Sequence, residues 1–421
     1  MLRQIEGSRA IAETVALCRP EVVCAYPISP QTHIIEAIGA MVKAGTLAPC
    51  EFINVESEFA AMSVAIGASA TGARAYTATA SQGLLYMIEA VYNAAGLGLP
   101  IVMTLANRAI GAPINIWNDH SDAMAVRDAG WIQLFAETNQ EAADLHVQAF
   151  RLAEELSVPV MVCMDGFILT HAVERVDILD QATVDRLLPP YEPRQVLDPA
   201  DPVSIGAMVG PEAFEEVRYL AHLRQLDALV RVPQIASDFE VVTGRASGGL
   251  VNCYRTDDAE TIVVALGSVL GTIKDAVDLR REVGERVGVV GITCFRPFPG
   301  DAVREALRGA SQIVVLEKAF SVGFGGVLAT DVAMSVHGDH HELRSVVAGL
   351  GGRPITRRSL EDLIGAAVRG DLPALTFLDL DHGSVDRERA RMAKTRRSGP
   401  SAENLLRDRG TVGVAKARRE S

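Results

Sequence analysis

The sequence predicts a doubly wound α/β protein with two such units in succession. Near-continuous apolar runs such as LPIVMTLA (99–106) and VPVMVCMD (158–165) are typical of parallel strands that are covered on both faces. Stretches with the apolar spacing of helices separate these runs, which is the alternation expected of a parallel sheet between helical layers. The chain has 421 residues, which is too long for one compact core, so more than one unit is expected.

The first unit is predicted over residues 1–175. Apolar residues at helical spacing after Pro30 indicate a helix, with Thr32 as its expected N-cap and Gly45 as its end. Strands are predicted at 22–26, 52–55, 75–80, 99–106 and 158–165. Ligands on such sheets bind at the carboxyl ends of the strands. We therefore expect the chemistry in the loops that follow Tyr26, Val55, Thr79 and Ala106.

The remainder of the chain is predicted to form three parts. Residues 176–258 are expected to be a proline-punctuated connection packed on the first unit, with one helix over 212–229 and Pro211 in its first turn. Residues 259–378 are expected to form a second, smaller α/β unit with strands at 261–267, 287–293, 313–318 and 343–351. The tail, 379–421, is basic, with little apolar periodicity, and is not expected to fold by itself. It is either a solvated tail or an arm that contacts a partner subunit.

Composition narrows the function classes. A net charge of −13 argues against general nucleic-acid binding, and no segment is apolar and long enough to span a membrane. The N-terminus lacks the pattern of an export signal, so a cytoplasmic location is expected. The six cysteines form no C-x-x-C pair, and such residues as Cys24, Cys163 and Cys294 are expected to be buried free thiols. If the protein handles electrons, iron–sulfur clusters must lie on other chains.

Two polar motifs follow predicted strands of the first unit. In YPISPQT (26–32), the prolines fix the backbone around Ser29 at a helix entry. This motif is either a turn with a cap or an oriented donor for an anionic ligand. In NVESEFAA (54–61), Glu56 and Glu58 precede a helix rich in small residues that implies close packing. The carboxylates either favour the helix N-terminus or, partly desolvated, have a tuned pKa for catalysis.

A third motif runs from Asn107 to Asp122. Arg108 directly follows a buried strand and is well placed to bind a carboxylate through two parallel hydrogen bonds. The run Asn118–Asp122 contains two aspartates and a histidine, but no further ligand cluster accompanies it. We expect this run to be held by side-chain-to-backbone hydrogen bonds, and no metal ligand is predicted. The sequence also contains no phosphate-binding loop of the G-x-G-x-x-G or P-loop type.

Several motifs, taken in order, resemble one family. The chain contains YPISP, ESEFAAMSVAIGASATGAR, TATASQGLLYM, NRAIGAPINIWNDHSD, MDGF…TH, FRPFP and GLGGRPIT. In this order, from about residue 5 to residue 375, they are similar to the alpha subunits of multi-subunit pyruvate:ferredoxin oxidoreductases and their relatives. The resemblance implies a thiamine-diphosphate pyrimidine-binding domain, doubly wound, followed by a smaller transketolase C-terminal-like α/β domain. It does not cover the tail.

The resemblance implies roles for three residues. Glu58 matches the glutamate that hydrogen-bonds the aminopyrimidine ring nitrogen of thiamine diphosphate and supports proton removal from the cofactor. Arg108 matches the arginine that binds the substrate carboxylate. Ser29 stands where the family usually has threonine, so the hydroxyl is kept, a methyl is lost and the exact substrate is left open. The diphosphate and Mg²⁺ are implied to be bound by a partner subunit.

The implied activity is the oxidative decarboxylation of a 2-oxoacid, by default pyruvate, to acyl-CoA and CO₂. Beta, gamma and delta-type subunits are the implied partners, with iron–sulfur clusters on these partners and ferredoxin or a flavin/NAD subunit as acceptor. One alternative is the same chemistry on an aromatic or branched 2-oxoacid such as phenylglyoxylate, with NAD as final acceptor. Another is a non-catalytic assembly subunit. A non-oxidative thiamine enzyme would share Glu58 but lack cluster-bearing partners, and the NRA…PINIWNDHSD stretch argues against it.

Overall fold

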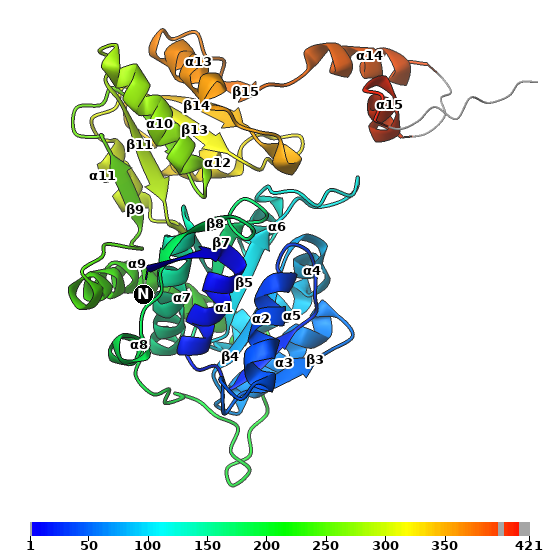
Figure 1. The fold of residues 1–421 in the computed structure, drawn as a ribbon, viewed down its shortest axis with the longest axis vertical. Coiled ribbons are helices and arrows are strands. Elements are labelled where there is room, and N and C mark those ends of the chain that lie inside the picture. The colour runs from blue at the N-terminus through cyan, green and yellow to red at the C-terminus, as the bar shows by residue number, and fades with distance from the viewer. Residues whose placement is uncertain (1, 395–399, 412–421) are drawn as a thin grey trace, which may run out of the picture.

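The computed structural model describes residues 2–394 and 400–411, which form two α/β units and a C-terminal arm (Figure 1). The larger unit is built on a seven-stranded sheet with the strand order β12-β6-β7-β5-β4-β2-β3. Every pairing in this sheet is parallel except that of β12 with β6. Its strands are β2 (Val22–Ala25), β3 (Glu51–Asn54), β4 (Ala75–Thr79), β5 (Val102–Asn107), β6 (Ile132–Phe135), β7 (Val160–Asp165) and β12 (Cys294–Arg296).

Helices cover both faces of this sheet, which confirms the doubly wound prediction. One core packs the sheet on α1 (Gly7–Leu17), α2 (Thr32–Lys43) and α7 (Asn139–Leu156). The other packs it on α3 (Glu58–Ala70), α4 (Ser81–Tyr86), α5 (Ile88–Leu97) and α6 (Ser121–Ala125). Every residue of β5 and β7 is buried, as their apolar runs predict.

The predicted N-cap at Thr32 is wrong by one residue. Gln31 occupies the cap position of α2, and Thr32 is the first helical residue. The Gln31 side chain makes no cap hydrogen bond, because its amide donates instead to the carbonyl oxygen of Tyr26 at 2.8 Å. The predicted end holds, since Gly45 has a φ of +71° just beyond the helix, a conformation that glycine adopts without strain.

The connecting segment contains α8 (Gln181–Leu187) and α9 (Phe214–Thr243), and it follows a two-stranded sheet of β1 (Leu2–Glu6) and β8 (Val173–Asp177). The helix predicted over 212–229 is too short, and Pro211 lies outside α9. The helix continues through Pro233, which normally interrupts a helix. Val232, Ile235 and Phe239 are buried in the first core, and their burial offsets the hydrogen bond that the proline removes.

The second unit is a six-stranded sheet with the order β15-β14-β13-β10-β11-β9, in which only β9 runs antiparallel to its neighbour. The elements of the second unit are β9 (Val251–Tyr254), β10 (Thr261–Ala265), α10 (Val269–Glu282), β11 (Val287–Ile292), α11 (Gly300–Leu307), β13 (Gln312–Glu317), α12 (Val327–Ser335), β14 (Glu342–Val347), the 3-10 turn η1 (Leu350–Gly352), α13 (Arg357–Val368) and β15 (Leu375–Phe377).

The four strands predicted for this unit are present, and each begins within about two residues of its predicted start. The strands β9 and β15, and β6 and β12 of the first unit, were not predicted.

The two units are joined by more than a linker. The chain leaves β11 in the second sheet and directly forms β12 at the edge of the first sheet. One apolar core is continuous across both units, and Phe135 meets Phe295 edge-to-face within it, with ring centroids 5.9 Å apart. The second unit is therefore packed firmly on the first.

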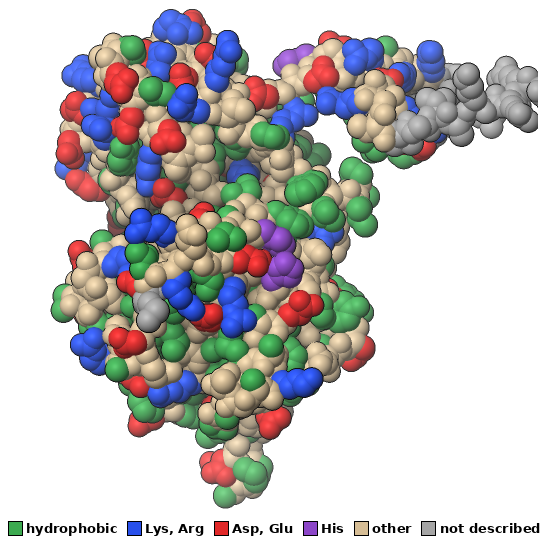
Figure 2. Space-filling view, in the orientation of Figure 1, with side chains coloured by type: hydrophobic (Ala, Val, Ile, Leu, Met, Phe, Trp, Pro, Cys, Tyr) green, Lys and Arg blue, Asp and Glu red, His purple; other side chains and the backbone are tan. Residues whose placement is uncertain are grey.

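The C-terminal arm extends from β15 and consists of α14 (His382–Met392) and α15 (Ser401–Asp408). The expectation that the tail does not fold is therefore wrong for these residues, while 395–399 and 412–421 lie outside the described ranges. Arg391 of α14 pairs with Asp408 of α15 at 2.7 Å, which holds the two helices together. The arm stands clear of the body, with open space between it and the first unit in this view (Figure 2). Across residues 2–394 and 400–411, no helix combines the length and apolar character needed to cross a membrane.

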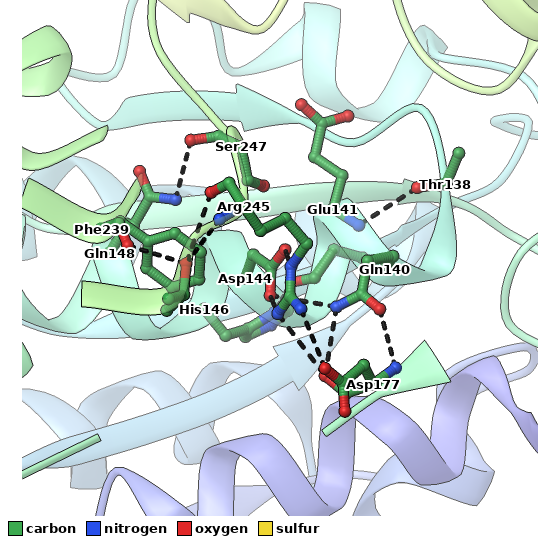
Figure 3. A network of polar contacts seen from close by, with 12 residues as sticks. Thr138, Gln140, Glu141, Asp144, His146, Gln148, Asp177, Phe239, Arg245 and Ser247 are labelled. Atoms are coloured by element: carbon green, nitrogen blue, oxygen red, sulfur yellow. Dashed lines mark hydrogen bonds and ion pairs between the residues drawn. The ribbon is translucent and has the colours of Figure 1, made fainter. Parts of the chain in front are cut away.

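A polar network ties the end of α9 to the first unit (Figure 3). Arg245 donates to Asp144 of α7 at 2.6 and 2.8 Å and to Asp177 of β8 at 3.3 Å. Burial raises the pKa of Asp144, and the Arg245 guanidinium opposes this shift. Nearby on α7, burial raises the pKa of Glu141 to about 7, even though its carboxylate accepts a hydrogen bond from the backbone N–H of Glu137 at 2.7 Å.

This shift predicts a pH dependence of stability. Between pH 4.5 and about 7, folded Glu141 keeps its proton while the unfolded chain releases it, so stability falls as the pH rises through this window. Glu141→Gln should remove this decline in the free energy of unfolding, which is on the order of 1–3 kcal/mol. Urea unfolding at about pH 5 and about pH 7.5 measures it. The exposed Glu282→Gln is the control, and a pH slope unchanged in Glu141→Gln would contradict the prediction.

Candidate active site

The segments after β2, β3 and β5 carry the predicted site residues Ser29, Glu58 and Arg108, at the carboxyl edge of the first sheet where they were expected. The loop after β7 packs closely beneath them. A Cβ atom on Gly166 would lie 2.5 Å from the carbonyl oxygen of Asn107 and 2.6 Å from Cγ of Pro30, so only glycine fits there without displacement. This close contact brings the segments around Ser29 and Arg108 side by side.

Arg108 is a buried arginine that joins two of these loops. Its Nη1 donates to the carbonyl oxygen of Ser29 at 3.0 Å, and its Nε donates to the carbonyl oxygen of Asn115 at 3.0 Å. Burial lowers the pKa of Arg108. Since a guanidinium carries more N–H groups than these two bonds use, the Nη1–Nη2 edge keeps donors for a carboxylate. The exposed Ser29 meets Arg108 through its backbone, and its hydroxyl is left for another partner.

Glu58 is the first residue of α3, after the N-cap Ser57, whose hydroxyl accepts the N–H of Ala60 at 3.1 Å. The side chain is buried, with 7% of the residue exposed. It lies against the turn that begins α4, where a Cβ atom on Gly83 would sit 2.8 Å from Oε1 of Glu58 and 2.5 Å from Oγ1 of Thr79. The hydroxyl of Thr79 is itself buried without a hydrogen-bond partner among the described residues. A buried carboxyl group beside an unsatisfied hydroxyl fits a small heterocycle with both donor and acceptor groups.

Gly83→Ala tests this close approach. The added methyl group would displace the Glu58 carboxylate or the Thr79 hydroxyl, so we expect kcat to fall by about tenfold or more. Gly271→Ala in α10 is the matched control, because a Cβ atom there meets nothing within 4 Å. Steady-state kinetics of both variants, with thermal melting as the check on folding, measure the difference. Equal kinetics in the two variants would contradict the assigned contact.

The residue that links these groups, Asp122, was not singled out from sequence. Its carboxylate accepts the backbone N–H of Arg108 at 2.9 Å, the N–H of Ser81 at 3.0 Å and the side-chain amide of Asn107 at 2.9 Å. Burial raises its pKa to about 7, although these donors favour the ionised form. Ser81 begins the helix that holds Gly83 against Glu58. Asp122 thus connects the Arg108 loop to the Glu58 side of the site.

The polar side chains of the run Asn118–Asp122 contact several different segments of the chain. Asp119 accepts the N–H of Ser121 at 3.0 Å and the N–H of Gly351 in the second unit at 3.0 Å. His120 lies 2.6 Å from Asp165. The side-chain-to-backbone bonds expected from the sequence are therefore present, and some of them reach the second unit.

A different group of side chains has spacing that could suit a metal ion. Among the described residues, Glu6, His33 and His171 have potential ligand atoms within 4.8 Å of one another. His33 Nδ1 lies 2.7 Å from Glu6 Oε1, and His171 Nδ1 lies 2.7 Å from Oγ1 of Thr170. The two imidazole rings are tilted by 34°, with centroids 4.7 Å apart. Protein groups already contact these side chains, and they carry no further assignment.

Two family models match the chain. The first, "Pyruvate flavodoxin/ferredoxin oxidoreductase, thiamine diP-bdg", matches residues 13–236. The second, "Pyruvate:ferredoxin oxidoreductase core domain II", matches residues 259–360. The residues matched by the thiamine-diphosphate-binding model include Ser29, Glu58, Arg108 and Asp122.

Curated relatives match over most of both lengths. The pyruvate synthase subunit PorA of Methanosarcina barkeri is 48% identical over 365 residues, which covers 86% of this chain and 91% of the relative. PorA of Thermotoga maritima is 44% identical and covers 88% and 95%. The ketoisovalerate oxidoreductase subunit VorA of Pyrococcus abyssi is 38% identical and covers 91% and 95%.

Solved structures agree on the fold. A 2-oxoglutarate:ferredoxin oxidoreductase from Magnetococcus marinus matches with a TM-score of 0.66 and 17% identity, over 87% of this chain and 65% of that longer chain. A split-gene transketolase matches with a TM-score of 0.52 and 14% identity. At these identities the structures support the architecture alone. The family models and the curated relatives go further: the chain belongs to the pyruvate:ferredoxin oxidoreductase family, as an alpha-type subunit similar to PorA.

Proposed function

We propose that this chain is the alpha subunit of a pyruvate synthase, which oxidatively decarboxylates pyruvate to acetyl-CoA and CO₂ and passes the electrons to iron–sulfur partner subunits. The observation that carries the proposal is the buried Glu58 at the carboxyl edge of a thiamine-diphosphate-binding fold, linked through Asp122 to Arg108. PorA relatives that are 42–48% identical support pyruvate as the substrate.

Glu58 and Thr79 are the residues that would hold the aminopyrimidine of thiamine diphosphate. When bound, the cofactor would supply a carbon nucleophile for the ketone carbon of a 2-oxoacid. The Glu58 carboxyl group would hydrogen-bond the pyrimidine ring nitrogen and so support proton removal from the cofactor. Because Glu58 is buried, water has little access to this contact.

Arg108 and Ser29 act on the substrate. The free edge of the Arg108 guanidinium binds the 2-oxoacid carboxylate, and the Ser29 hydroxyl donates a second, neutral hydrogen bond. The hydrogen bond from the Arg108 guanidinium to the carbonyl oxygen of Ser29 keeps the two donors together. Together they would orient the 2-oxoacid by its carboxylate for decarboxylation.

The other half of the cofactor site is proposed to lie on a beta-type subunit, which supplies the diphosphate and Mg²⁺ contacts. The face beside Glu58 carries exposed aromatic side chains suited to such a partner, among them Phe59, Tyr86 and Tyr92. The arm of α14 and α15 is proposed as a second contact with a partner subunit, which the open space beneath it supports (Figure 2). A cytoplasmic location also remains a proposal, and the six free cysteines support it.

A branched 2-oxoacid is the second candidate substrate, because the VorA relative is 38% identical over 91% of this chain. An affinity tag on this chain, with mass spectrometry and iron analysis of what co-purifies, tests the partners. Viologen reduction by the same preparation, with coenzyme A and a panel of pyruvate, 2-oxoisovalerate and phenylglyoxylate, tests the substrate. We expect iron-containing beta, gamma and delta-type subunits and the highest kcat/KM on pyruvate. If the chain purifies alone and reduces no dye, the proposed activity is wrong, and the alternative of a non-catalytic assembly subunit is favoured.

A further inference from the structure

A buried ion pair joins the two units beneath the Arg108 loop. Lys318 directly follows β13 of the second unit, and its ammonium lies 2.9 Å from Asp165 at the end of β7 in the first unit. The Lys318 and Asp165 residues are 3% and 1% exposed. His120 approaches the other oxygen of Asp165 at 2.6 Å, and the backbone N–H of Ser268 after β10 donates to Asp165 at 3.2 Å. The cluster therefore draws on both sheets.

Such a pair is poor evidence for stability in itself, because the cost of removing two charges from water is comparable to what their attraction returns. Burial alone would raise the pKa of Asp165, but Lys318 and His120 hold it well below its usual range. The buried contact between Lys318 and Asp165 leaves little freedom of geometry, since each partner must satisfy the other. It fixes the end of β7 relative to the start of the segment that follows β13.

The ammonium of Lys318 also reaches the site loop. It donates to the side-chain oxygen of Asn118, and the Asn118 amide donates to the carbonyl oxygen of Asn107 at 3.2 Å. The Lys318 carbonyl oxygen accepts the N–H of His120 at 2.9 Å. Asn107 precedes Arg108 and donates to Asp122 at 2.9 Å. One side chain, that of Asn118, therefore separates the Lys318 ammonium from the backbone that carries Arg108.

The second unit also contacts the loop between Arg108 and Asp122 at another point. The side-chain amide of Asn115 donates to the carbonyl oxygen of Gly351 at 3.1 Å, and Asp119 accepts the N–H of that glycine. A Cβ atom on Gly352 would lie 2.4 Å from Cβ of Trp117. The loop between Arg108 and Asp122 is thus held from outside its own unit along its length.

We propose that Lys318 is a positioning residue of the second unit, which fixes the substrate-binding Arg108 through Asn118 and Asp165. This inference rests on the proposed role of Arg108 in substrate binding. It gives the second α/β unit a part in the active site, although that unit supplies no group that touches the substrate in the proposed mechanism. Loss of Lys318 frees the loop and lowers the fraction of sites with Arg108 in the binding position, so the effect falls on KM more than on kcat.

The test compares Lys318→Met with Lys274→Met in the purified complex. Lys274 of α10 makes an ion pair with Glu137 of the first unit at 2.7 Å, so it also joins the two units, although its side chain is more exposed, and it holds no part of the Arg108 loop. We expect Lys318→Met to raise the KM for pyruvate by about tenfold with kcat within about twofold, and Lys274→Met to change neither by more than about twofold. An unchanged KM in Lys318→Met would overturn the proposal.

A double variant separates positioning from general destabilisation. If Lys318 acts through Arg108, then adding Lys318→Met to Arg108→Ala should raise the KM by less than about twofold further. A full additional tenfold increase would mean that Lys318 acts by another route and would overturn the inference. If Arg108→Ala alone leaves the KM unchanged, the proposed substrate role of Arg108 is wrong. The single variant therefore tests that role independently of the role proposed for Lys318.

Asn118→Leu keeps the test decisive if Lys318→Met does not fold. This variant leaves the Lys318–Asp165 pair in place and cuts the connection from Lys318 to Asn107. It should raise the KM in the same direction, by several-fold, with a melting temperature that shows a folded chain. A folded Asn118→Leu complex with the parental KM would overturn the proposal.

Discussion

Replacement of Glu58 by glutamine is expected to lower kcat by about 10²–10⁴-fold, the range that a positioned proton-transfer group contributes. Glutamine has nearly the same shape and keeps an oxygen acceptor, so the buried turn against Gly83 should stay intact. It cannot hold the proton that the cofactor ring nitrogen requires. The loss should therefore appear in kcat, while the KM for the 2-oxoacid and assembly of the complex change little.

Glu56→Gln is the matched control for this variant. Glu56 lies two residues before Glu58 in the same motif but is exposed, so its replacement should leave kcat within about twofold. Viologen reduction by the two purified complexes, at saturating thiamine diphosphate, measures both values. A Glu58→Gln complex with parental kcat would remove the assigned role of this carboxyl group.

Arg108→Ala is expected to raise the KM for the 2-oxoacid by about 100-fold or more, since a buried two-point bond to a carboxylate is lost. The truncation also frees the carbonyl oxygens of Ser29 and Asn115, which Arg108 now holds. Arg108→Lys should not restore the KM, because an ammonium cannot reproduce the guanidinium fork.

Arg127→Ala separates this effect from a general loss of positive charge. Arg127 lies just beyond the same loop, is partly exposed and pairs only distantly, at 3.8 Å, with Asp128. Initial rates over a wide range of pyruvate concentration should show the parental KM for this control. If Arg108→Ala and Arg127→Ala shifted the KM equally, Arg108 would not be the carboxylate-binding residue.

The strands of both units could be predicted because parallel strands covered on both faces need unbroken apolar runs, as in β5, β7 and β13. The short β6 and β12 lack such runs. Their place in the sheet depends on each other and on Phe135, which packs on Phe295 from a distant part of the sequence. The helix predicted to end at residue 229 continues to Thr243, because Ile235 and Phe239, beyond Pro233, are buried in the core that also contains α7.

The candidate site residues could be predicted from the sequence more readily than the side chains that support them. Ser29, Glu58 and Arg108 follow predicted strands, and parallel strand order alone places such residues at one edge. Asp122, Asp165 and Lys318 act through contacts between segments far apart in the chain, and Lys318 lies 153 residues from Asp165. An isolated lysine after an apolar strand carries no pattern that would reveal its partner. Such contacts emerge only from the packing of the two units.

The most direct test of the central claim is pyruvate-dependent viologen reduction by a complex reconstituted from separately purified subunits. Thiamine diphosphate, Mg²⁺ and coenzyme A are supplied, and this chain is either included or omitted. We expect dye reduction only when this chain, a cluster-bearing partner and thiamine diphosphate are all present. Reduction that continues without this chain, or a fully assembled complex that reduces the dye with no 2-oxoacid, would contradict it.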